Sequence, residues 1–150
     1  MQKLVFLFLV LISTTISAQD SQLNWLLDFD KAKNISKEQD KPILVYFTGS
    51  DWCGPCKRLK ADFFSSEDFK TKAEDFVLLL VDMPRRNDII TPEQRKKNAA
   101  LMKKYNKKGS FPNIFGLDSK GKVLTEISGY NMMRDTSYHF AFLDELQKKF

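Results

Sequence analysis

Runs of apolar residues along the chain predict the strands of a β-sheet. Residues 43–47 and 76–81 are short and continuously apolar, as expected of strands buried on both faces. Residues 113–117 and 122–127 flank a short turn that contains Asp and Gly, so they predict a β-hairpin. Residues 22–27 form a weaker run and predict a short first strand. Together these segments predict one sheet built from strands far apart in the chain.

The intervals between these runs have apolar residues at helical spacing. Residues 29–36 predict a first helix, whose start Asp28 or Asp30 can cap. Residues 57–64 have apolar side chains four positions apart on one face, so a second helix is predicted soon after the first buried strand. A third, short helix is predicted over residues 69–74, after a serine-rich N-cap.

Two longer helices are predicted in the second half of the chain. Thr91 is a good N-cap and Pro92 suits the first helical position, so a helix should run from there to about Asn106. A final amphipathic helix is predicted near the C-terminus. The positions expected to face the core are Ala99, Met102 and Tyr105 in the first helix, and Tyr138, Phe142, Leu143 and Leu146 in the second. The element order predicts an α/β fold with a central mixed sheet flanked by helices, ending in a hairpin and a helix.

Residues 1–18 are predicted to be a signal peptide rather than part of the fold. Lys3 provides a positive start, residues 4–12 are unbroken apolar, and Ala18 is a small residue at the expected cleavage position. The apolar run is shorter than the roughly 20 residues of a transmembrane helix. We therefore expect one exported domain over residues 19–150, periplasmic or secreted, with an uncleaved N-terminal anchor as the alternative.

Charge and composition add little to this picture. The net charge is +5, and Lys and Arg are interspersed with Asp and Glu, which is typical of a solvated surface and does not indicate nucleic-acid binding. Thirteen phenylalanines predict a Phe-rich core. The predicted function therefore depends on the cysteines.

Both cysteines of the chain lie in residues 52–57, with the sequence WCGPCK, where the first buried strand gives way to a helix. Unpaired N–H groups in a first helical turn, together with the positive charge of Lys57, favour a thiolate there. Cys53 is expected to be the exposed, acidified sulfur, and Cys56 lies within reach of a disulfide with it. Pro55 is tolerated because the first turn loses no intrahelical hydrogen bond there.

The segment WCGPCK resembles the active site of the thioredoxin superfamily, whose members are thiol–disulfide oxidoreductases. The later segment Gly109-Ser110-Phe111-Pro112 resembles the loop of that family in which a cis proline faces the cysteines. The resemblance covers about residues 40–148 and implies a thioredoxin-like fold. It also implies a cis bond between Phe111 and Pro112 that exposes backbone for pairing with a substrate peptide. An ordinary trans proline is the alternative.

In this interpretation Cys53 attacks a substrate disulfide and Cys56 resolves the mixed disulfide. A purely structural disulfide is the first alternative, although so short a loop constrains the unfolded chain little. A zinc site is the second, but two cysteines and the single, distant His139 fall short of four ligands. We therefore expect no metal and no cofactor other than the redox-active pair. His139 is expected at the surface or partly buried.

Other residues near the motif have predicted supporting roles. Trp52, Gly54, Pro55, Phe111 and Pro112 are expected to contact substrate, with simple packing as the alternative for the tryptophan.

The chain departs from the family in its proton handling. Thioredoxin itself has a buried acid on the strand before the motif, whereas Tyr46 or Phe47 falls near that place here. Asp51 is a nearby acid on a loop, expected in solvent. Tyr46 or water is therefore expected to serve the second cysteine, and Tyr46, Asp51 and Lys57 are the predicted modulating residues.

The leading functional hypothesis is an exported, monomeric reductase of client proteins that contain disulfides or thiols. Gly54-Pro55 adds no charge between the cysteines, which favours a reducing pair supplied with electrons by a membrane protein. Disulfide oxidation or isomerisation is the second hypothesis, and a non-catalytic thioredoxin-like binding module is the third.

Overall fold

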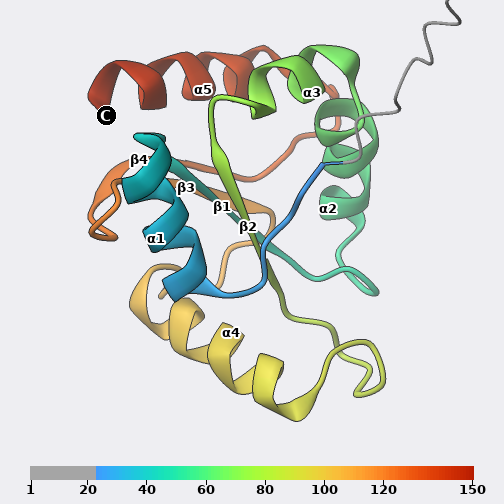
Figure 1. Ribbon diagram of the computed structural model, residues 1–150. Coiled ribbons are helices and arrows are strands. Elements are labelled where there is room, and N and C mark those ends of the chain that lie inside the picture. Colours follow the sequence, from blue (N-terminus) through green and yellow to red (C-terminus); the bar gives the residue numbers. More distant parts are fainter. Residues whose placement is uncertain (1–22) are drawn as a thin grey trace, which may run out of the picture.

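The computed structural model describes residues 23–150, and its centre is a four-stranded sheet in the order β2-β1-β3-β4 (Figure 1). The strands are β1 (Ile43–Thr48), β2 (Val77–Asp82), β3 (Asn113–Leu117) and β4 (Val123–Ser128). β1 runs parallel to β2 and antiparallel to β3, and β4 completes the hairpin. The predicted mixed sheet and hairpin are confirmed. The predicted signal peptide, residues 1–18, lies outside the described residues.

Helices cover both faces of this sheet. α1 and α4 lie on one face, and α2, α3 and α5 lie on the other (Figure 1). The segment η1 continues α2 as a π-helix, in which the turns are wider than in an α-helix. The helices are α1 (Phe29–Gln39), α2 (Gly54–Leu59), η1 (Lys60–Phe64), α3 (Glu67–Ala73), α4 (Pro92–Lys104) and α5 (Ser137–Lys149).

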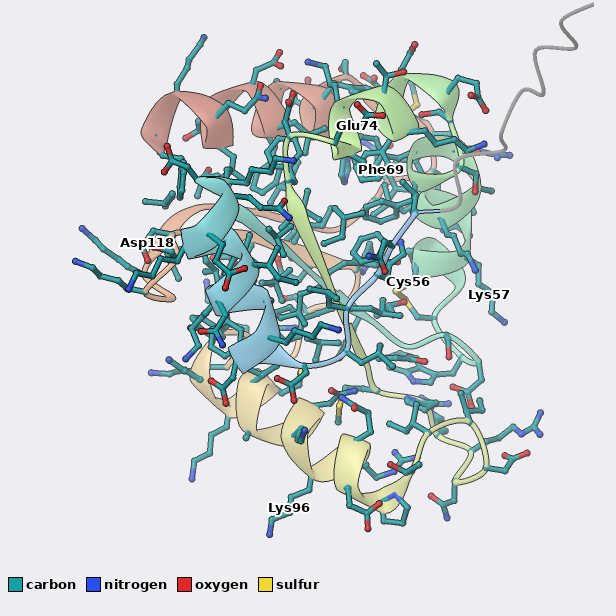
Figure 2. The ribbon with its side chains drawn as sticks, viewed as in Figure 1. Cys56, Lys57, Phe69, Glu74, Lys96 and Asp118 are labelled. Carbon is teal, nitrogen blue, oxygen red and sulfur yellow. A yellow bond between two sulfur atoms is a disulfide. The ribbon has the colours of Figure 1, made fainter. Side chains whose placement is uncertain are left out.

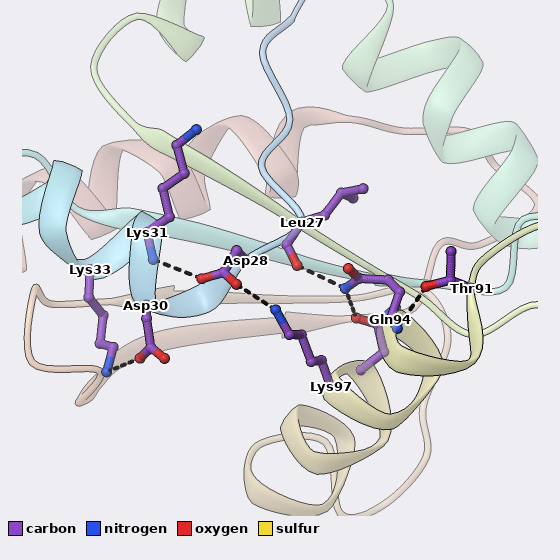
Figure 3. A network of polar contacts seen from close by, with 9 residues as sticks. Leu27, Asp28, Asp30, Lys31, Lys33, Thr91, Gln94 and Lys97 are labelled. Atoms are coloured by element: carbon purple, nitrogen blue, oxygen red, sulfur yellow. Dashed lines mark hydrogen bonds and ion pairs between the residues drawn. The ribbon is translucent and has the colours of Figure 1, made fainter.

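The helix starts follow the predicted capping residues. The side chains of Asp28, Ser66 and Thr91 each accept a hydrogen bond from a backbone N–H three residues later. Asp28 also forms an ion pair with Lys97 of α4 at 2.7 Å (Figure 3). In the same network Gln94 donates to the backbone carbonyl of Leu27 at 2.8 Å. The start of α1 is thus tied to the first half of α4.

The core has two apolar layers, one on each side of the sheet. Alternate residues of β1 supply both, with Leu44 and Tyr46 in one layer and Ile43, Val45 and Phe47 in the other. Among residues 23–150 seven phenylalanines are buried, which agrees with the predicted Phe-rich core: Phe47, Phe63, Phe64, Phe69, Phe76, Phe115 and Phe142.

The predicted first strand at residues 22–27 is reduced to one bridge beside β2. The Leu26 N–H donates to the carbonyl of Leu78, and the Leu80 N–H donates to the carbonyl of Leu26, both at 2.9 Å. The pairing ends there because Asp28 already caps α1.

Two residues predicted to face the core point outward instead. Ala99 is exposed, because the inward stripe of α4 runs through Asn98 and Leu101. Tyr138 is 67% exposed, because the buried stripe of α5 begins one residue later, at His139, and continues through Phe142. The other predicted positions are confirmed, since Phe142, Leu143 and Leu146 are buried and Met102 and Tyr105 pack against the core.

His139 is therefore a core residue, 4% exposed, rather than the surface or partly buried residue predicted. Its ring lies 5.4 Å from the Phe63 ring and 5.5 Å from the Tyr130 ring, measured between centroids. Burial lowers the pKa of His139, against the opposing effects of a hydrogen bond with the Gly129 backbone and the charge of Asp135.

This burial predicts a loss of stability in mild acid. The unfolded chain binds a proton at histidine near pH 6.5 while the folded chain resists it, so the free energy of unfolding should fall as pH drops below about 6.5. We expect His139→Gln to weaken this dependence between pH 7.5 and 5, measured by urea denaturation. The same pH dependence in the variant and the wild type would contradict the prediction.

Candidate functional site

The two cysteines lie at the N-terminus of α2 and are joined by a disulfide, with their Cα atoms 5.2 Å apart. Cys53 is the N-cap, and its sulfur accepts the N–H of Cys56 at 3.2 Å. Pro55 occupies the first turn, as predicted, together with Gly54. The predicted exposure of Cys53 is wrong: it is 3% exposed and Cys56 is 2% exposed. The disulfide keeps the Cys53 sulfur above the first turn of α2, where it accepts the hydrogen bond from the N–H of Cys56.

Trp52 is held beside the cysteines on several sides. Its indole N–H donates to the carbonyl of Met83 at 2.9 Å, and its ring meets the Phe111 ring edge-on at a centroid distance of 5.3 Å. A Cβ at Gly49 would lie 2.3 Å from the indole, so only glycine allows the backbone to approach this closely. The guanidinium of Arg85 lies 4.8 Å from the ring centroid. Trp52 is therefore a fixed surface rather than a free side chain.

The bond between Phe111 and Pro112 is cis, which confirms the prediction. The loop before it is fastened by the buried Asn106, whose amide donates to the Ser110 carbonyl at 2.7 Å and accepts the Ser110 N–H at 3.1 Å. β3 begins directly after Pro112, at a residue paired with Phe47 near the end of β1. The loop and the cysteine motif therefore lie at the same end of the sheet.

Tyr46 lies under α2, with its hydroxyl donating to the backbone carbonyl of Cys56 at 3.3 Å. Burial raises the pKa of Tyr46 to about 12, and the charge of Asp82 adds to this effect while a hydrogen bond with Thr48 opposes it. The phenol therefore stays protonated near neutral pH and is poorly suited to accept a proton from the second cysteine.

Asp51 differs from the solvent position expected for it. Its carboxylate accepts the backbone N–H groups of Arg85 and Arg86 at 3.0–3.1 Å. Desolvation raises the pKa of Asp51, but these hydrogen bonds outweigh it and the net pKa is lowered. Lys57 is exposed and its ammonium donates to the backbone carbonyl of Asp51 at 3.0 Å. Asp51 therefore shapes the loop beside Trp52.

A cavity of about 310 Å³ adjoins the second cysteine, and it contains an acid that the sequence interpretation missed. Asp82, at the end of β2, lines this cavity together with Cys56 and Tyr46. It is 7% exposed, and its carboxylate accepts both the backbone N–H and the hydroxyl of Ser50. A signal was present, since Asp82 follows a buried strand parallel to β1, and functional residues gather where parallel strands end.

Neither a metal-binding cluster nor a membrane-spanning helix is found among residues 23–150. In that range no three His, Cys, Asp or Glu side chains are grouped so as to hold a metal ion. No helix among the same residues has both the length and the apolar character needed to cross a membrane.

The fold and the cysteine pair are those of a thioredoxin-like protein. Residues 24–119 match the family model described as thioredoxin-like, and the chain belongs to this family. The solved structure of a DsbH oxidoreductase superposes with a TM-score of 0.73 at 32% identity, covering 84% of this chain and 85% of that one. The oxidised C-terminal domain of DsbD from Neisseria meningitidis has a TM-score of 0.53 at 23% identity, over 80% of this chain and 90% of that one.

Two curated relatives come from Chlamydia pneumoniae. The disulfide bond reductase DsbH is 35% identical over 71% of this chain and 63% of its own length. The thioredoxin-related protein DsbJ is 28% identical over 83% of this chain and 37% of its own length. The chain thus spans less than two thirds of each of these relatives.

Proposed function

We propose that this protein is an exported, monomeric thiol–disulfide oxidoreductase that reduces disulfides in client proteins. The observation that carries the proposal is the Cys53–Cys56 pair at the start of α2, at the same end of the sheet as a cis-proline loop. The similarity to a protein named as a disulfide bond reductase supports the direction of electron flow. The charge-free Gly54-Pro55 pair between the cysteines supports it as well.

The chemistry is two successive thiol–disulfide exchanges. In the reduced protein the Cys53 thiolate attacks one sulfur of the client disulfide, and the other client sulfur leaves as a thiolate and takes up a proton. The Cys56 thiolate then attacks the Cys53 sulfur and releases the second client thiol. Two electrons pass to the client and the pair becomes a disulfide, so a thiol-bearing donor, for which we propose a membrane protein, must reduce it again.

The surrounding residues have supporting roles in this proposal. The N–H of Cys56, which meets the Cys53 sulfur at 3.2 Å, stabilises negative charge on that sulfur. Trp52 and Phe111 form the wall against which a client lies. The backbone next to Pro112 pairs with an extended client segment.

In this proposal the Asp82 carboxylate accepts the proton that the Cys56 thiol must lose before the second exchange. Asp82 is suited to this role because it lines the same cavity as Cys56. We expect Asp82→Asn to slow release of the client about a hundredfold at pH 7, and less at pH 9, where hydroxide can act instead. The rate of mixed-disulfide decay, followed by acid quenching across this pH range, measures the effect.

Glu74→Gln is the matched control, since it removes the same charge from an exposed site at the C-terminal end of α3, far from Cys56 in Figure 2. It should leave the decay rate unchanged. A pH-independent loss in Asp82→Asn would assign this residue a structural role instead.

Two measurements separate the functional alternatives. We expect the Cys53/Cys56 pair to be more reducing than the glutathione couple in a redox titration, and the reduced protein to reduce insulin. A more oxidising pair would replace reduction by oxidation or isomerisation. Failure to reduce insulin would favour the non-catalytic binding module.

Export is tested separately. The exported protein should have lost residues 1–18, which its intact mass would reveal. A mass that retains these residues would favour the uncleaved anchor.

A further inference from the structure

Three basic side chains lie beside the cysteine motif, two of them on α2 and one stacked on Trp52. Lys57, Arg58 and Arg85 are together called the basic rim. Arg85 stacks over Trp52, with its guanidinium 4.8 Å from the ring centroid. Arg58 Nη1 lies 3.7 Å from the point that a Cβ on Gly54 would occupy. Lys57 is exposed and projects outward from α2 (Figure 2). Positive charge thus lies on both sides of the motif.

The position of Arg85 is built into the fold. The backbone N–H groups of Arg85 and Arg86 donate to the Asp51 carboxylate at 3.0–3.1 Å. From α4, Arg95 donates to the carbonyls of Pro84 at 2.7 Å and Arg86 at 2.8 Å. These contacts fix the backbone on both sides of Arg85, although its side chain is exposed.

The acids near the basic rim form their hydrogen bonds and ion pairs with backbone N–H groups or with other side chains, although Asp62 is near enough to Arg58, and Asp51 to Arg85, for a weaker electrostatic attraction. Asp51 accepts backbone N–H groups, while Asp62 pairs with Arg134 and Asp88 pairs with Arg86. Within residues 23–150 no ion pair joins a carboxylate to a side chain of the basic rim. Part of this charge is also held out of water, because the Nε of Arg58 is buried and has no hydrogen-bond partner. The rim therefore offers positive charge that a bound partner can meet.

A client that reaches the sulfurs comes close to the positive charge of the basic rim. Cys53 directly follows Trp52, whose ring contacts Phe111, so a client disulfide that reaches Cys53 must come close to the surface formed by these two rings. Side chains next to the client cysteines then lie near Arg85 and Lys57, where a carboxylate is attracted and an ammonium repelled. A guanidinium stacked on an aromatic ring keeps its planar donors free for a carboxylate.

We propose that the basic rim recognises client proteins whose disulfides are flanked by acidic side chains. This inference rests on the proposed function and specifies its substrate class. Electrostatic attraction of this kind raises association rates and weakens as salt screens it.

The test uses two synthetic peptides with an internal disulfide, identical except for Glu or Lys on both sides of the cysteines. The full chain is reduced beforehand, and rate constants are measured at low and high salt. Each is divided by the rate with dithiothreitol to remove intrinsic differences between the peptides. We expect the Glu peptide to react about tenfold faster at low salt, with the ratio approaching one in 1 M salt.

Arg85→Gln should remove most of this preference. Lys96→Gln is the matched control: it removes one positive charge from the exposed face of α4, far from α2 in Figure 2, and should preserve the ratio. Equal normalised rates for the two peptides in the wild type, or equal effects of the two substitutions, would overturn the inference while the proposed function stands. Reduction of neither peptide would contradict the proposed function itself and the inference with it.

Discussion

Replacing Cys56 with serine is expected to turn the protein into a trap that stays covalently attached to its clients. Cys53 can still attack, but the serine hydroxyl is not deprotonated near neutral pH and cannot form the disulfide that releases the client. Turnover should fall by about a thousandfold or more, because the step is lost rather than slowed. Adducts should accumulate, visible on non-reducing gels and in intact mass spectra.

Cys53→Ser is the matched control, and it should lose turnover equally while forming no adduct. Exposure does not distinguish the two sulfurs, since Cys53 and Cys56 are 3% and 2% exposed in the disulfide. The distinction rests on the N–H of Cys56, which donates to the Cys53 sulfur and favours a thiolate there. Adducts formed by Cys53→Ser, and none by Cys56→Ser, would reverse the assignment.

Phe63→Ala is expected to lower the free energy of unfolding by about 3–5 kcal/mol. The ring is fully buried in η1 and lies 4.8–5.0 Å from the rings of Phe64, Phe69 and Phe140, measured between centroids. Its loss leaves a cavity and removes edge-to-face contacts. Domains of this size are stable by only about 5–15 kcal/mol, so the shift in the urea denaturation midpoint of the oxidised protein should be large.

Tyr138→Ala is the control for this prediction, because that ring is 67% exposed on α5. It should change the free energy of unfolding by less than about 0.5 kcal/mol. A loss below about 1 kcal/mol in Phe63→Ala would mean that the surrounding rings close the cavity.

The strands could be predicted because apolar runs such as residues 43–47 and 76–81 are stable only between two covering layers. Helix starts could be predicted from single side chains, since Asp28, Ser66 and Thr91 each satisfy a free N–H group. The cis-proline loop came from resemblance to a known family rather than from propensity, because most X-Pro bonds are trans.

Other features depend on tertiary contacts that apolar runs and capping residues do not specify. The wide π-helical turn of η1 buries both Phe63 and Phe64. The spacing of an α-helix would place only Phe63 on the same face as Leu59. The burial of Cys53 depends on the disulfide and the first turn of α2. Asp82 reaches the cavity beside Cys56 only because β2 pairs in register with β1, which opposes Asp82 to Thr48.

The positions of the two tryptophans have a practical consequence. The chain has two, and both lie close to the cysteines: Trp52 precedes Cys53, and Trp25 lines the cavity that Cys56 also lines. Trp25 packs against Tyr46 and Phe64, which hold its ring beside the cavity. Disulfides quench nearby indole emission, so opening the Cys53–Cys56 bond should brighten the intrinsic fluorescence of the protein. The molecule thus has a built-in optical reporter, with which its oxidation state can be followed in real time without an added dye.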